Sequence, residues 1–85
     1  MSIFTVEKVL FDIVSTPDMV AKYKAAPDAF LDGYPLEADE RKLILELDVF
    51  VLVQRSINPM LMSRVFAALR GREHMPEYRQ RLKGA

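Results

Sequence analysis

The sequence predicts a single all-α domain, residues 1–85, folded as a compact bundle of about five short helices. Three observations lead to this prediction. Helix-start signals divide the chain into helix-sized pieces, and apolar residues recur with the period of an amphipathic helix. One apolar stretch alternates as a strand would, but no second strand-like segment is present to pair with it.

The first predicted helix runs to about Val14, with Ser2 or Thr5 as its N-cap. The second begins at Thr16-Pro17, because threonine accepts hydrogen bonds from free amides and proline needs no donor at the first helical position. The apolar residues of the first helix follow the spacing of one buried stripe: Val6, Val9, Leu10, Ile13 and Val14.

Pro27 restarts the chain, and about one turn of helix leads to Gly33, which we expect to stop it in the left-handed conformation. A long helix then opens at Ala38 and continues through the apolar stretch from Leu43 to Val53. Asp48, amid apolar neighbours, is expected to lie within this helix, partly buried and paired with an arginine. A strand over the alternating valines is the competing interpretation.

Asn58-Pro59 predicts the next helix start, and Gly71 its end. Pro76 opens a last short helix that runs to Leu82. The expected apolar face of the helix after Pro59 is Met60, Leu61, Val65, Phe66 and Leu69.

The 12 basic and 12 acidic residues cancel, but they are unevenly placed. Residues 1–54 hold five basic and ten acidic residues, whereas residues 55–85 hold seven basic and two acidic residues. This asymmetry fits two faces that attract each other within one fold, and it also fits a basic face that meets an acidic partner or an anionic substrate. A neutral chain without an aromatic-interleaved basic stripe is not expected to bind nucleic acid.

Cysteine is absent, which removes disulfides, thiolate nucleophiles and thiolate metal ligands. No segment is long and apolar enough to span a membrane, and the first residues lack the basic region of a signal peptide, so we expect a cytoplasmic protein. Small domains without disulfides often gain stability by association. A partner protein or a homo-oligomer is therefore expected.

Catalytic, cofactor-binding and metal-binding residues are not expected in this chain, because it has no phosphate loop, Ser-His-Asp set, zinc spacing or calcium loop. The single histidine, His74, follows Glu73, and adjacent side chains on a helix do not face each other. Asp39, Glu40 and Glu46 are expected on the solvated surface. Three methionines and Phe66 form either a docking face or ordinary core: Met60, Met62 and Met75.

Several short segments follow one another in an order and spacing that match a known family. They are Tyr23-Lys24-Ala25, Phe30-Leu31-Asp32, Tyr34-Pro35-Leu36, Asp48, Ile57-Asn58-Pro59 and Leu61-Met62-Ser63-Arg64-Val65-Phe66. Over residues 14–69 the chain resembles the LigA-type small (alpha) subunit of protocatechuate 4,5-dioxygenase and related extradiol aromatic-ring-opening dioxygenases. Glu37 stands where that family usually has a capping threonine or serine, and beyond Leu69 the chain does not follow the family pattern.

The resemblance implies a helical, non-catalytic subunit that docks on a large (beta) subunit and covers its active site. In such enzymes the large subunit binds a non-haem Fe(II) through two histidines and a carboxylate and cleaves catecholic aromatic acids. Arg70 and Arg72 lie beyond the matched residues, and they are candidate substrate-facing residues because they belong to the basic part of the chain, which would attract an anionic aromatic acid. The positions expected at the partner interface are Asn58, Pro59, Met60, Met62, Arg64 and Phe66.

Two other functions remain open from the sequence. LigA-like domains also serve as recognition modules outside ring cleavage, so the chain fits a stand-alone helical module that binds a peptide-modifying or other enzyme. The third hypothesis is a domain that associates with itself and has no connection to catalysis.

Overall fold

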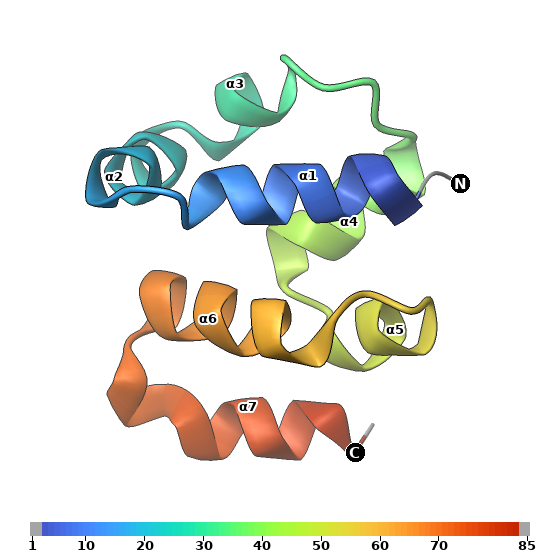
Figure 1. The fold of residues 1–85 in the computed structure, drawn as a ribbon, viewed down its shortest axis with the longest axis vertical. Helices are drawn as coiled ribbons and strands as arrows, with labels where there is room; N and C mark the ends of the chain where they lie inside the picture. The colour runs from blue at the N-terminus through green and yellow to red at the C-terminus, as the bar shows by residue number, and fades with distance from the viewer. Residues whose placement is uncertain (1–2, 84–85) are drawn as a thin grey trace.

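Helices make up the regular structure of residues 3–83, the part of the chain that this computed structural model describes (Figure 1). Five of them have eight residues or more, and no strand occurs within this range, which confirms the all-α prediction. None of these helices has the length and apolarity needed to cross a bilayer. The elements are α1 (Ile3–Ile13), α2 (Pro17–Ala25), α3 (Pro27–Leu31), α4 (Ala38–Glu46), α5 (Val49–Gln54), α6 (Pro59–Arg70), the 3-10 turn η1 (Arg72–His74) and α7 (Met75–Leu82).

The core forms where α1, α6 and the shorter helices meet, and α6 lies between α1 and α7 in Figure 1. The predicted stripe of α1 is buried from Val6 to Ile13, with Val14 partly buried behind it. The expected face of α6 is partly wrong, because Met60 is exposed and Met62 is fully buried in its place. The core side chains of α6 are Met62, Val65 and Phe66.

Helix starts follow the predicted capping residues. The Thr16 hydroxyl accepts a hydrogen bond from the Met19 amide at 3.1 Å, and Asn58 Oδ1 accepts one from the Met60 amide at 2.8 Å. For α1, Ser2 lies outside the described residues, and Thr5 lies inside the helix rather than at its N-cap.

Gly71 ends α6 with a φ of 96°, and a Cβ there would meet the Glu73 carboxylate, so the position requires glycine. Gly33, by contrast, does not have the expected left-handed backbone. The helix before it, α3, ends at Leu31.

The predicted long helix through Asp48 is instead two helices that meet at Leu47-Asp48. Leu47 adopts the left-handed conformation (φ 50°, ψ 53°), and the Asp48 amide donates to the Leu43 carbonyl at 3.0 Å, a closure typical of helix ends. Asp48 is partly buried, as expected, but its carboxylate accepts from the Val51 amide at 3.3 Å and so caps α5. It does not need the arginine partner that the sequence suggested.

Arg81 of α7 stabilises this break. Its Nη1 donates to the carbonyl oxygens of Glu46 and Leu47 at the end of α4, both at 3.0 Å. The Leu47 carbonyl also accepts from the Val49 amide at 2.8 Å. The Arg81 guanidinium also lies 5.5 Å from the centre of the Phe66 ring, within range for a cation–π contact. One side chain therefore joins the end of α4 to the core of α6.

Glu40 is a correction to the expected surface. Its side chain is only 1% exposed, and its Oε1 accepts the Glu37 backbone N–H at 2.8 Å. Glu37 is the N-cap residue of α4, and the two glutamates form a capping box. Glu37 therefore caps α4, although it is neither a threonine nor a serine.

Replacing Arg81 by methionine, which keeps the apolar stem and removes the donors, should lower the free energy of unfolding by about 1.5–3 kcal/mol, because two carbonyls lose charged hydrogen bonds. Denaturant unfolding followed by circular dichroism measures this loss. Arg79→Met is the matched control, since Arg79 is exposed on the same helix, and it should change stability by less than about 0.5 kcal/mol. Equal effects of the two changes would contradict the role given to Arg81.

Candidate docking surface

The outward side of α6 is a continuous strip of exposed and half-exposed side chains. Residues 60, 64, 67 and 68 recur at helical spacing, and Arg72 follows in η1. Met60 is 77% exposed, so a large apolar side chain lies open to a partner on this side of α6. We call this strip the α6 surface, and its members are Asn58, Met60, Arg64, Ala67, Ala68 and Arg72.

Two shallow hollows lie along the α6 surface. The first, of about 400 Å³, lies between α1 and α6 and is lined by Glu7, Phe11, Asn58, Met60, Leu61 and Arg64. The second, of about 300 Å³, is lined by Arg64, Ala67, Ala68 and Arg72. Because Arg64 lines both, the two hollows adjoin and offer one apolar end and one basic end to a partner.

The residues expected at the interface fall into two groups. Asn58, Pro59, Met60 and Arg64 are exposed, so their side chains can meet a partner. Met62 and Phe66 are fully buried in the core, so neither can present its side chain to another chain. On α6, positions two residues apart point in different directions, which separates Met62 from Met60.

Arg70 and Arg72 are both exposed, but the structure does not bring them together. Arg72 lines the basic hollow of the α6 surface, whereas Arg70 lines a separate hollow with Tyr23, Lys24 and Leu69. The break at Gly71 and the two-residue spacing direct them to different parts of the surface.

Ion pairs within the fold neutralise only part of the uneven charge distribution along the sequence. Arg55 reaches Asp39 at 3.2 Å and so links the basic part of the chain to the acidic part. Arg64 and Arg72 form no ion pair within residues 3–83. These two arginines are therefore available to an acidic group from outside.

His74 is exposed at the end of η1. Within residues 3–83, no group of three or more His, Asp or Glu side chains is arranged to hold a metal ion.

Two exposed phenylalanines on α1 were not among the residues that the sequence singled out. Phe4 is 85% exposed and Phe11 is 55% exposed. Both lie on the side of α1 opposite the buried valines, and their seven-residue separation places them in one line along the helix. The sequence already indicated this exposure, because neither phenylalanine belongs to the apolar stripe of α1 that was expected to be buried.

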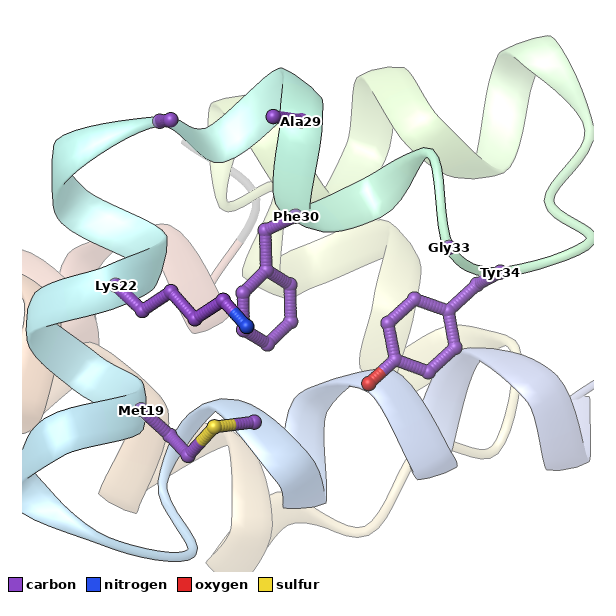
Figure 2. Close-up of a pocket in the computed structure, with 7 residues that line it drawn as sticks. Met19, Lys22, Ala29, Phe30, Gly33 and Tyr34 are labelled. Atoms are coloured by element: carbon purple, nitrogen blue, oxygen red, sulfur yellow. The ribbon is translucent and has the colours of Figure 1, made fainter.

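A pocket of about 460 Å³ between α2 and α3 is also new to the sequence analysis (Figure 2). Met19 and Lys22 extend into it from α2, while Phe30 and Tyr34 form the other side, with the Tyr34 hydroxyl directed toward α1. The rings of Phe30 and Tyr34 are stacked with their centres 5.9 Å apart. The pocket is mostly apolar, and Lys22 is its cation.

The Tyr34 hydroxyl donates to Asp12 Oδ2 at 2.6 Å, and Lys8 Nζ donates to Oδ1 of the same carboxylate at 2.9 Å. Burial and this hydrogen bond raise the pKa of Tyr34 to about 12, since both disfavour the phenolate. Burial works to raise the pKa of Asp12, but the bonds from Tyr34 and Lys8 outweigh it and hold that pKa below its usual value. The pair fixes the linker after α3 against α1.

No family model matches the chain, and no curated protein or solved structure is significantly similar to it.

Replacing Phe66 by alanine should lower the free energy of unfolding by about 3–5 kcal/mol, because it leaves a cavity in the core. Replacing the exposed Met60 by alanine should change it by less than about 0.5 kcal/mol. Thermal or chemical unfolding of the two variants measures the difference. A small effect at Phe66 would mean that its side chain is not in the core and could serve an interface after all.

Replacing Tyr34 by phenylalanine should flatten the alkaline pH dependence of stability. The pKa of Tyr34 is about 12 in the folded state, while an unfolded tyrosine ionises near 10.0. The unfolded state therefore binds fewer protons between these values, so the stability of the wild type falls as pH rises. Denaturant unfolding at stepped pH measures the two slopes, and parallel slopes would contradict the raised pKa of Tyr34.

Proposed function

We propose that this chain is a cytoplasmic, non-catalytic small subunit that docks through the α6 surface onto the large subunit of an Fe(II)-dependent extradiol ring-cleavage dioxygenase, an enzyme of aromatic compound catabolism. The observation that carries the proposal is the exposure of Met60 beside Asn58 and Arg64. These residues lie within the part of the chain that resembles the LigA-type pattern, and they are three of the six positions expected at the partner interface.

The apolar end of the α6 surface supplies affinity in this proposal. Met60 is unbranched and adapts to an irregular surface, and burying such a side chain contributes about 1.5–3 kcal/mol. Phe11 and Leu61 form the walls of the hollow beside it, so a side chain of the large subunit that enters there is surrounded by apolar atoms. Asn58 and Glu7 provide polar groups at the rim.

The basic end supplies orientation. Arg64 and Arg72 flank two alanines, and small residues let another backbone approach closely between the two guanidinium groups. Carboxylates of the large subunit are the matching groups for arginine. Near the mouth of an active site the same positive charge would attract an aromatic acid.

The chemistry belongs to the partner in this assignment. The large subunit holds the Fe(II), which activates O₂ and the catechol, and this chain covers the cleft. Covering a cleft excludes water and restricts the substrate, which is a contribution that needs no catalytic side chain.

A second function, a stand-alone recognition module for a peptide-modifying or other enzyme, is favoured by the pocket between α2 and α3. Its apolar lining with one lysine fits an apolar side chain next to a carboxylate, a combination that a peptide offers. This pocket lies outside the α6 surface, so substitutions at Met19 and at Met60 separate the two functions.

The test is co-expression with a candidate large subunit, followed by size-exclusion chromatography and by O₂ uptake on protocatechuate-like catechols with Fe(II). Met60→Asp and Arg64→Glu should each weaken the complex at least about tenfold, because one places a charge in an apolar contact and the other reverses an ion pair. O₂ uptake should fall as the complex is lost. Arg79→Glu is the matched control on α7, and it should leave the complex intact.

Two separate peaks, with O₂ uptake indifferent to this chain, would overturn the dioxygenase assignment. A complex that forms normally with both α6 variants would keep the partner but remove the α6 surface as its docking site.

A further inference from the structure

A hollow of about 310 Å³ opens where the ends of α2, α4 and α6 meet the start of α3. None of its lining residues belongs to the α6 surface or lines the pocket between α2 and α3, so a ligand here would be independent of both functions proposed above. We call it the α2–α6 hollow. It has a polar side and an apolar wall, formed by Tyr23, Lys24 and Arg70 and by Leu45, Leu47 and Leu69.

Two cations from different helices share this hollow. Lys24 lies in the last turn of α2, Arg70 is the last residue of α6, and both are exposed. Neither forms an ion pair or a side-chain hydrogen bond within residues 3–83, and none of the carboxylates in that range lines the hollow. Cations are favoured at the C-terminal ends of helices, but that preference leaves their hydrogen-bond donors unused. Two like charges beside one apolar hollow attract an anion.

Tyr23 adds a third polar group to the hollow. The residue is only 6% exposed, and its ring packs edge-on against Phe30. Its hydroxyl has no hydrogen bond within residues 3–83, and no buried side-chain oxygen or nitrogen in that range lacks a partner, so the hydroxyl is the part that reaches solvent. Burial and Asp28 raise the pKa of Tyr23 while Arg70 acts against them, because its positive charge lies near the hydroxyl. Asp28 itself is paired with Arg41 at 3.0 Å.

We propose that the α2–α6 hollow binds a small carboxylic acid with an aliphatic chain. The two cations and the phenol hydroxyl donate hydrogen bonds to the carboxylate, which has acceptor positions for all three. The aliphatic chain lies on the wall of Leu45, Leu47 and Leu69, whose side chains have no polar atoms.

The size and the lining of the hollow favour this occupant over other anions. Ligand pockets in proteins typically measure about 300–1,000 Å³, so this hollow accommodates only a small molecule. A nucleotide or a sugar needs polar partners around its body, and the leucine wall offers none. The carboxyl terminus of a peptide would place backbone N–H groups against the same wall, which is costly for the same reason. Inorganic phosphate would leave the wall uncovered.

Binding should be weak, because the hollow is shallow and both cations are exposed. For octanoate, which we choose as the probe, we expect a dissociation constant on the order of 1 mM. Octanoate is titrated into the isotope-labelled full chain and followed by nuclear magnetic resonance. The amide signals of Lys24, Leu47 and Arg70 should shift and saturate.

Two further ligands separate the contributions of the charge and of the chain. Octanol has a chain of the same length without the charge, and acetate has the carboxylate without the long chain. Each should bind at least about tenfold more weakly than octanoate, because each loses one of the two contacts.

Variants of the polar side test each donor. Lys24→Met and Arg70→Met remove one charge and keep an apolar stem, so each should weaken octanoate binding about three- to fivefold, and the double variant at least about tenfold. Tyr23→Phe should weaken it about threefold and leave the thermal unfolding curve unchanged, because the hydroxyl has no hydrogen bond within the described chain to lose. Lys22→Met is the matched control, since Lys22 is exposed on the same helix and lines the other pocket, and it should leave binding unchanged.

Circular dichroism of every variant confirms that the helices persist. Octanol that binds as tightly as octanoate would overturn the proposal, as would the absence of saturating shifts at roughly tenfold the expected dissociation constant. Shifts centred on Met19 and Phe30, with Lys22→Met as weak as Lys24→Met, would place the ligand in the pocket between α2 and α3 instead. N-acetyl-leucine that binds more tightly than octanoate would replace the free acid by a peptide carboxyl terminus.

Discussion

The contact between Arg81 and the junction of α4 and α5 is the interaction on which the rest of the fold depends. A chain that turns sharply after Glu46 leaves carbonyl groups at the end of α4 without helical donors, and such groups take donors from elsewhere. Arg81 supplies those donors from the far end of the chain and packs its guanidinium over Phe66. The last helix is therefore part of the core, and Glu77 one turn earlier helps to orient the arginine through an ion pair at 3.2 Å.

Helix boundaries could be predicted from the sequence where the cause is local. Thr16, Asn58 and Gly71 act on groups within three or four residues of themselves, and each was placed correctly. The break at Leu47 has a local signal in Asp48, whose carboxylate caps α5, but the contact of Arg81 with the Leu47 carbonyl spans 34 residues and could not be predicted in this way. Burial of Glu40 was missed for a different reason, since a charged residue in a first turn normally faces water and here closes a capping box with Glu37 instead.

The sequence could point to a segment for the expected interface, but it could not tell which side chains of that segment are exposed. Asn58 and Pro59 mark where α6 begins, and that start determines which residues face outward. Met60 and Met62 are the same type of residue, but Met60 is exposed and Met62 is buried. Residue type alone therefore could not separate core from surface. The periodicity that predicts the buried stripe of α1 also defines its opposite face, where Phe4 and Phe11 are exposed.

The positions of the tyrosines give the molecule its own optical reporters. The chain has three tyrosines and no tryptophan, so its near-ultraviolet signal comes mainly from those phenols. Tyr23 lies edge-on to the Phe30 ring of α3, the Tyr34 hydroxyl donates a hydrogen bond to Asp12 of α1, and the Tyr78 hydroxyl donates one to the Pro59 carbonyl of α6. Loosening of the first helices and loosening of the last helix therefore change different chromophores, and partial opening at either end can be followed by spectroscopy without an added label.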